Sequence, residues 1–193
     1  RPAVLNISGG TIQNSTAQSY GGLIAVTAST SPVEINISGG TFQGGKAVRG
    51  GILWTEDDCD INITGGTFTA SEATENGGLF YLDGGANVTL SGGNFIGGTA
   101  AGVGDGIYVK NANLTITGEA QFSGEGTNIY VENTTDKAVV VIDNPADSLM
   151  TVDAADKSAA FASSETNCAA KLYSADENYI TTWADGKFYL VAN

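Results

Sequence analysis

Residues 38–42 read Ser-Gly-Gly-Thr-Phe, and this segment decides the fold because the chain repeats it. Related copies begin at Ser8, Thr64 and Ser91, and a weaker copy begins at Thr117, so the period is 26 to 30 residues. Each copy follows an alternating apolar strand and precedes a Thr-aromatic strand, a loop, a second glycine pair and another apolar strand. A period of this length built from short strands and glycine corners is typical of a β-solenoid.

The apolar positions predict which side chains face the core. Side chains two residues apart on a strand share a face, so each kind of strand contributes one inward stack. Three stacks predict an all-β fold, a three-sided right-handed parallel β-helix of about five regular coils; right-handed crossovers are the default for parallel strands. The predicted stacks are Leu5/Ile7, Ile35/Ile37, Ile61/Ile63, Val88/Leu90 and Leu114/Ile116; then Ile12, Phe42, Phe68, Phe95 and Phe122; then Leu23/Ala25, Ile52/Trp54, Leu79/Tyr81, Ile107/Val109 and Ile129/Val131.

The repeat register is lost after about Glu132. We therefore expect residues 1–131 to form the β-helix repeats and residues 132–193 to form degenerate terminal coils with a C-terminal β cap. A cap is expected because the end of a solenoid exposes unpaired strand edges. A separate small domain is the alternative interpretation of residues 132–193. The expected elements are strands at 138–142 and 148–152 and a hairpin at 179–191 that turns at Ala184-Asp185-Gly186.

Composition restricts the classes of partner. The chain has 193 residues with 8 basic and 21 acidic side chains, a net charge of −13 and no histidine. This balance argues against binding nucleic acid and against anionic membrane surfaces. No apolar run approaches the ~20 residues that span a bilayer, so we expect no membrane insertion. Arg1-Pro2 leads directly into a strand, so we expect no signal peptide here and a piece of a longer protein with flanking domains.

Two outward surfaces are candidate ligand sites. The first is a stripe on the third strands, in which one position that should face water carries an apolar or aromatic residue in each coil. Such exposed apolar patches mark contact surfaces. It would bind a sugar or a protein, or the C-terminal segment or a neighbouring domain would cover it. The second is a polar ladder on the second strand. The stripe is Ile24, Leu53, Phe80, Tyr108 and Tyr130, and the ladder is Thr11, Gln13, Thr41, Gln43, Thr67, Thr69 and Asn94.

The densest acidic cluster is the only candidate for a metal site, and it is a weak one. Glu56, Asp57, Asp58 and Asp60 could offer oxygen ligands to calcium, but calcium needs 6–8 oxygens and no EF-hand pattern is present. A solvated loop is the simpler interpretation. Cys59 falls in an inward register and is expected to be a small buried hydrophobe. Two cysteines in unrelated contexts do not predict a disulfide framework.

Catalysis has little support in the sequence. The absence of histidine excludes Ser-His-Asp and Cys-His arrangements. Only Asp57-Asp58 resembles the carboxylate pair of a polysaccharide-cleaving β-helix enzyme, and no basic residue lies in register beside it. We therefore predict a non-enzymatic chain without a cofactor. A fragment of a polysaccharide lyase or hydrolase is one alternative. An ice-binding solenoid is another, although the ladder becomes irregular at Asn94/Ile96 and Gln121/Ser123.

The repeats at about residues 4–131 resemble the right-handed parallel β-helix repeats of bacterial cell-surface adhesin-like proteins. More loosely, they are similar to the repeats of chlamydial polymorphic outer-membrane proteins, without the Ala that follows Gly-Gly there and without an Asn after Phe42 or Phe68. The resemblance implies an extracellular bacterial protein, secreted or displayed on the cell surface, that serves as an adhesin stalk or as a platform for a host glycan or protein. The second likeness rests on Gly21-Gly22-Leu23-Ile24, Gly50-Gly51-Ile52-Leu53 and Gly77-Gly78-Leu79-Phe80.

Overall fold

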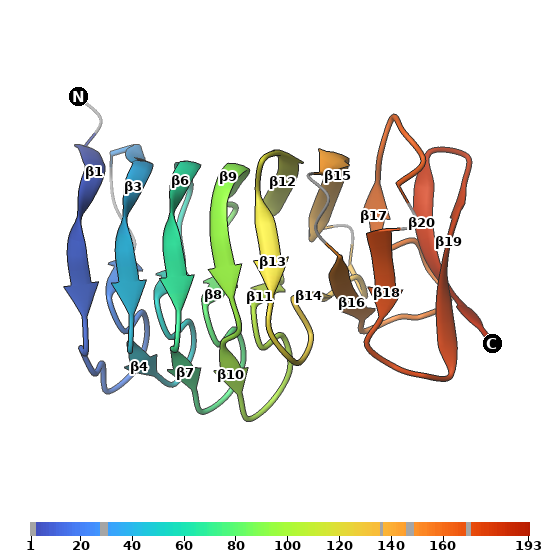
Figure 1. Cartoon of the computed structure of the whole chain (residues 1–193), viewed down its shortest axis with the longest axis horizontal. Coiled ribbons are helices and arrows are strands. Elements are labelled where there is room, and N and C mark those ends of the chain that lie inside the picture. The colour runs from blue at the N-terminus through green and yellow to red at the C-terminus, as the bar shows by residue number, and fades with distance from the viewer. Residues whose placement is uncertain (1–2, 28–30, 136, 146–148, 169–170) are drawn as a thin grey trace.

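Parallel strand pairing dominates the computed structural model, which describes residues 3–27, 31–135, 137–145, 149–168 and 171–193. The strands stack along one axis into a β-solenoid of about five turns (Figure 1), as the sequence predicts. Within the described ranges there is no α-helix. None of these residues forms a helix long and apolar enough to cross a membrane. Arg1 and Pro2 lie outside the described residues.

The largest sheet has ten strands and runs the length of the rod. Its order is β1-β3-β6-β9-β12-β15-β17-β20-β19, and β13 also pairs with β9. Pairing is parallel up to β17 and antiparallel at β17–β20 and β20–β19. The strands are β1 (Ala3–Gln13), β3 (Val33–Gln43), β6 (Cys59–Thr69), β9 (Asn87–Ile96), β12 (Asn113–Gly118), β13 (Gln121–Ser123), β15 (Val139–Pro145), β17 (Ala162–Ser163), β19 (Tyr179–Ala184) and β20 (Lys187–Ala192).

Two smaller parallel sheets form the other sides. One has seven strands in the order β18-β16-β14-β11-β8-β5-β2, and the other has three in the order β10-β7-β4. The seven are β2 (Ile24–Val26), β5 (Leu53–Thr55), β8 (Phe80–Leu82), β11 (Ile107–Val109), β14 (Ile129–Val131), β16 (Met150–Ala154) and β18 (Leu172–Ser174). The three are β4 (Lys46–Ala47), β7 (Glu72–Ala73) and β10 (Thr99–Ala100).

The glycine pair turns a strand without ending it. The expected first and second strands of a coil are one continuous strand in β1, β3, β6 and β9, and the pairing register shifts at the Gly-Gly step of β1–β3 and β6–β9. Gly40 has φ of 106°, a conformation that glycine adopts without steric strain. The Ser-Gly-Gly-Thr motif therefore marks an irregularity within one continuous strand of the large sheet.

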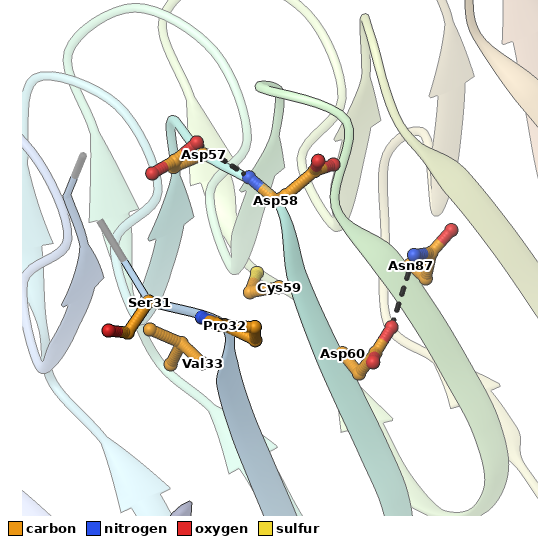
Figure 2. Close-up of a pocket in the computed structure, with 8 residues that line it drawn as sticks. All are labelled: Ser31, Pro32, Val33, Asp57, Asp58, Cys59, Asp60 and Asn87. Carbon is orange, nitrogen blue, oxygen red and sulfur yellow. Dashed lines mark hydrogen bonds between the residues drawn. The ribbon is translucent and has the colours of Figure 1, made fainter. Parts of the chain in front are cut away.

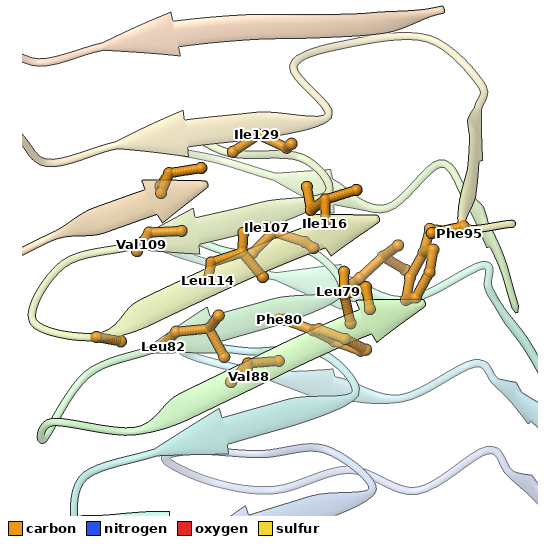
Figure 3. Packing of buried hydrophobic residues seen from close by; sticks show 14 of the residues in the cluster. Leu79, Phe80, Leu82, Val88, Phe95, Ile107, Val109, Leu114, Ile116 and Ile129 are labelled. Carbon is orange, nitrogen blue, oxygen red and sulfur yellow. The ribbon is translucent and has the colours of Figure 1, made fainter. Parts of the chain in front are cut away.

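The core consists of in-register stacks, and Figure 3 shows part of it. The first-strand pairs stack as predicted; for example Ile35 lies opposite Ile61, which is 1 % exposed. The rings of Phe42, Phe68 and Phe95 are nearly parallel, with centroids 4.8 and 5.0 Å apart. We call these three and Phe122, which stacks on Phe95 at 5.0 Å, the inner phenylalanine stack. Cys59 is buried in register with Val33, as expected.

In the first coils the predicted inward facing of the third strand is confirmed for Leu23, Ile52 and Leu79, which pack in the core. The facing of the residues that follow them is wrong. Phe80 pairs with Ile107 rather than with Tyr108, and Tyr81 pairs with Tyr108. Leu53 and Phe80 therefore point into the core, where they are 2 % and 0 % exposed, and Phe80 packs edge-on against the inner phenylalanine stack. Ile24, opposite Leu53, packs against the core as well.

The wrong prediction comes from aligning the third strands of successive coils on the glycine that precedes each of them. Leu79 donates its backbone N–H to the Gly106 carbonyl, so the coil that continues into Ile107 has a glycine at the level where the previous coil has leucine. Aligning Leu79 with Ile107 shifts the strand by one residue. Because side chains alternate with a period of two, a one-residue slip exchanges the two faces. Trp54 and Tyr81 consequently point outward.

The C-terminal elements confirm several expectations. β15 and β16 overlap the two expected strands, begin one and two residues later and extend the two long sheets, although Ser148 lies outside the described residues. β19 and β20 form the predicted antiparallel hairpin, and Asp185 and Gly186 at its turn both have positive φ. β19 also reaches across to β18, where the Thr181 hydroxyl donates to the Leu172 carbonyl. The hairpin thus closes this end of the rod.

Candidate functional site

An aromatic ladder lies on the outward side of the seven-stranded sheet. It consists of Trp54, Tyr81, Tyr108 and Tyr130, one from each of four successive strands. The rings of Tyr81 and Tyr108 stack at 4.9 Å, and those of Tyr108 and Tyr130 at 5.5 Å. We call this set the outer aromatic ladder. It replaces the predicted stripe, of which only Tyr108 and Tyr130 keep their outward place.

The chain itself nearly closes three residues of the outer aromatic ladder to water, and Tyr130 is half-buried. Trp54, Tyr81 and Tyr108 are 5 %, 3 % and 6 % exposed. The loop that precedes each third strand folds back over it, and a β-carbon built on Gly50 would lie 2.1 Å from the Leu53 carbonyl oxygen and 3.1 Å from the Trp54 β-carbon. Gly50 has φ of 64°, so this close approach requires glycine. The cover therefore comes from loops of the same and of the preceding coil, whereas the sequence left a ligand, the C-terminal segment and a neighbouring domain open.

Charged side chains complete the cover. The Arg49 guanidinium lies 5.7 Å from the centre of the Tyr20 ring and 5.5 Å from that of Tyr81, and its Nε donates to the Glu75 carboxylate at 2.6 Å. Tyr20 stacks on Trp54 at 4.5 Å. Cations over aromatic faces are attracted by the ring quadrupole. Sequence reasoning missed Arg49 and Tyr20 because both lie in loops whose length varies between coils. Their contact with the ladder is expected only when the register of the third strand is shifted by one residue, because Trp54 and Tyr81 then face outward.

The hydroxyl end of the ladder is tied to acidic groups. The Tyr108 hydroxyl donates to the Glu132 carboxylate at 3.1 Å. Burial, and secondarily the charge of Glu132, raises the pKa of Tyr108. Burial also raises the pKa of Tyr81 and of Tyr130. The raised pKa values favour the neutral form of all three phenols, and Tyr108 uses its proton in the hydrogen bond to Glu132.

The predicted polar ladder lies on the glycine-bent strands, in register from coil to coil. Thr41 lies beside Thr67, and Thr67 beside Asn94. The neighbouring column contains Gln13 and Gln43, whose side-chain amides are joined by a 2.6 Å hydrogen bond, followed by Thr69. All these side chains, with Thr11, are exposed or half-buried. This face therefore presents exposed or half-buried polar groups in register.

The acidic cluster borders an open pocket of about 430 Å³, shown in Figure 2. Asp57 accepts a hydrogen bond from the backbone N–H of Asp58, while Asp60 accepts one from the Asn87 amide at 3.1 Å. The labelled carboxylates point in different directions in Figure 2. Among the described residues there is no group of three or more His, Cys, Asp or Glu side chains that could hold a metal ion, so Glu56 and these aspartates do not form one.

The thiol beside this pocket is poorly suited to chemistry. Burial, followed by the charges of Asp60, Asp57 and Asp58, raises the pKa of Cys59 to about 12. The nucleophile and metal ligand is the thiolate, and at neutral pH this group stays a thiol. The pocket therefore presents separate carboxylates with a protonated sulfur beneath them.

Ion pairs link one coil to the next along the outer surface. Lys46 bonds Glu72 at 2.7 Å and Lys110 bonds Asp83 at 3.1 Å. Asparagine amides do the same on the large sheet, where Asn62 donates to Asn36 and Asn36 to Asn6, each at 3.1 Å. These ion pairs and amide bonds thus run along the rod and join equivalent positions.

The fold and these ladders define the chain as a parallel β-solenoid. Searches against family models, curated proteins and solved structures gave no significant match.

Proposed function

We propose that this chain is a non-catalytic module of a secreted or surface-displayed bacterial protein, and that it acts as a rigid stalk that presents neighbouring adhesive parts. The observation that carries the proposal is the direction of the polar contacts. Ion pairs and amide ladders join equivalent positions of successive coils, while the acidic side chains diverge. A binding or catalytic centre needs groups that converge on a ligand. Groups paired along an axis stiffen a rod.

The repeat resemblance supports the same role, because it implies a secreted or surface-displayed protein that serves as an adhesin stalk or as a binding platform. The covered outer aromatic ladder also supports it. Neighbouring rings and the Arg49 guanidinium occupy the faces of these rings, so the ring contacts stabilise the rod.

Mechanical unfolding tests the stalk. The chain is held at its two ends and stretched in an atomic-force experiment. Because each coil contacts its neighbours through parallel strands, we expect stepwise release, and a coil of 26 to 27 residues should add about 90 Å of contour length. Phe68→Ala should lower the force of the central steps, whereas Thr67→Ala beside it should leave them unchanged. One low-force event for the whole chain would contradict the proposal.

A carbohydrate- or protein-binding platform is the second candidate, and the exposed polar ladder favours it. Threonine and glutamine side chains in register offer a flat row of donors and acceptors over Thr41, Thr67 and Gln43. A glycan array and a host-protein panel, probed with the intact chain, separate the two functions. If a ligand binds the native chain but not the Thr67→Ala and Gln43→Ala variants, and the unfolding midpoints are unchanged, the chain is a binding platform and the stalk function is rejected.

The enzyme and ice-binding alternatives have direct assays. Acidic and neutral polysaccharides are incubated with the chain, with and without calcium. Oligosaccharide release that Asp58→Asn abolishes would overturn the non-catalytic assignment. Thermal hysteresis that Thr67→Ala removes would establish ice binding instead.

A further inference from the structure

The outer aromatic ladder is a file of rings that can each lose one electron. Four neighbouring strands of the seven-stranded sheet, β5, β8, β11 and β14, contribute Trp54, Tyr81, Tyr108 and Tyr130 (Figure 1). The ring centres of Tyr81 and Tyr108 are 4.9 Å apart, and Trp54 packs in the same cluster as these two rings. Overlap between neighbouring π-systems lets an electron pass from ring to ring, so a one-electron vacancy formed on one ring can move along the ladder.

Burial shields the middle of the ladder from solutes. Trp54, Tyr81 and Tyr108 are 5 %, 3 % and 6 % exposed, and each lies on a strand that pairs with a neighbouring coil on both sides. A phenoxyl radical in open solution is consumed by coupling with a second radical, which requires contact between the two rings. A radical on Tyr108 is protected from such contact with another molecule, so the ladder can hold the vacancy inside the rod.

Tyr108 has a bonded proton acceptor, the Glu132 carboxylate. Its hydroxyl donates to Glu132 Oε2 at 3.1 Å, and Glu132 Oε1 accepts a second hydrogen bond from the Thr134 hydroxyl at 2.8 Å, which fixes the carboxylate. A phenol that loses an electron becomes a strong acid, whereas an oxidised indole keeps its N–H proton far more readily. A vacancy that reaches Tyr108 is therefore trapped there, because the phenolic proton moves to the carboxylate as the electron leaves.

The charges beside the rings favour the same end point. The Arg49 guanidinium lies 5.5 Å from the centre of the Tyr81 ring, whereas the carboxylate bonded to Tyr108 is negative. Positive charge disfavours an electron vacancy on a neighbouring ring, and negative charge favours it. Tyr81 is thus a transfer step in the ladder, and Tyr108 is the end point.

We propose that the outer aromatic ladder is a one-electron relay, which takes the oxidising equivalent of a radical oxidant at Trp54 and holds it at Tyr108. The oxidant belongs to the class of one-electron acceptors, such as peroxyl radicals, and is reduced by the electron that Trp54 loses. An electron from Tyr108 then reaches Trp54 through Tyr81, while the Tyr108 O–H bond breaks and its proton moves to Glu132. The net products are the reduced oxidant, a neutral phenoxyl radical on Tyr108 and a protonated Glu132. The proposal does not depend on the stalk function.

A tethered photo-oxidant tests the relay. Glu56 is exposed and lies two residues after Trp54, so Glu56→Cys offers a labelling site for a ruthenium polypyridyl complex, while the native cysteines, Cys59 and Cys168, are buried. A light flash in the presence of a soluble electron acceptor oxidises the complex beside Trp54. We expect the absorbance of the tryptophanyl radical to decay as that of the tyrosyl radical rises, more slowly in deuterated water because a proton moves to Glu132. A tryptophanyl radical that decays without a tyrosyl signal would refute the relay.

Protein variants identify the end point. Tyr108→Phe should reduce the tyrosyl signal and prolong the tryptophanyl radical, and Glu132→Gln, which keeps an acceptor oxygen but takes up no proton, should slow the transfer. Tyr173→Phe, on β18 outside the ladder, is the matched control and should change neither signal. Circular dichroism verifies that the variants fold; if Glu132→Gln does not, the comparison of Tyr108→Phe with Tyr173→Phe decides. Equal transfer kinetics in these two variants would mean that the radical resides on another ring and would overturn the assignment.

Discussion

The inner phenylalanine stack and the outer aromatic ladder are two columns of rings with almost the same geometry. Ring separations are 4.8 to 5.0 Å in the first and 4.9 to 5.5 Å between the tyrosines of the second. The phenylalanines, and the ladder apart from half-buried Tyr130, are closed to water by different means. Sheets enclose the phenylalanines, whereas glycine loops approach Trp54, Tyr81 and Tyr108, and Arg49 covers Tyr81. Stacked aromatic rings on the outside of a solenoid can therefore belong to its structure, and exposure has to be established before a ligand is assigned to them.

The largest effect is expected in the inner stack. Phe68 is fully buried between two other phenylalanines, so Phe68→Ala should leave a cavity and lower the free energy of unfolding by about 3–5 kcal/mol. Thr67→Ala, one residue away and facing outward, should change it by less than ~0.5 kcal/mol. Urea denaturation of both variants measures the difference, and a larger loss for Thr67→Ala would refute the assigned facing of the strand.

The outer ladder should be sensitive to its glycine cover. Gly50→Ala places a β-carbon against the Leu53 carbonyl at positive φ, and should destabilise the fold by about 1–3 kcal/mol while exposing Trp54. Trp54 emission should shift to the red in a Trp183→Phe background. Gly9→Ala is the matched control, because a β-carbon there meets no atom within 4 Å. Unchanged Trp54 emission in Gly50→Ala would mean that the loop does not seal the ladder.

The two columns should also differ in their response to alkaline pH. A tyrosine in the unfolded chain loses its proton near pH 10, and burial raises the pKa of folded Tyr108 above that value. The folded state then holds its proton more tightly, so stability is full below about pH 10 and falls as pH rises further. Tyr108→Phe should make this decline shallower in thermal melts from pH 8 to 12. Tyr173→Phe, at a half-exposed site, should leave the decline as it is, and an identical slope in both variants would contradict the assignment.

The smallest effects separate two ion pairs between the same coils. Arg49 bonds Glu75 and covers two rings, whereas Lys46 bonds Glu72 with both side chains more than half exposed. Arg49→Ala should destabilise by about 1 kcal/mol, because a cation–π contact is lost with the ion pair. Lys46→Ala should lose under ~0.5 kcal/mol, as exposed pairs do. Equal losses in equilibrium unfolding would show that Arg49 contributes as an ion pair alone.

Much of the fold could be predicted because the repeat encodes it locally. The alternation around Ile61 and Ile63 and the aromatic after each Gly-Gly-Thr place two inward stacks correctly. The turn residues Ala184-Asp185-Gly186 likewise predict the C-terminal hairpin, which the structure confirms.

The candidate site was harder to predict, because it depends on a single residue of spacing. Leu79 of one coil lies level with Gly106 of the next, so an alignment of the two third strands on their glycines is wrong by one residue. The local sequence pattern does not reveal this shift. The prediction therefore placed Leu53 and Phe80 on the outward face, whereas both point into the core. The cover by Arg49 arises from a loop whose path follows from close backbone packing, which propensity and periodicity do not describe.

The pairing of each strand with the equivalent strand of the next coil keeps the effect of a substitution local. Each coil contacts only its neighbours, so a loss of packing spreads outward from the coil in which it occurs. After Phe68→Ala, amide protection should therefore fall first in β6 and in its partners β3 and β9, and the β19–β20 hairpin should keep its protection.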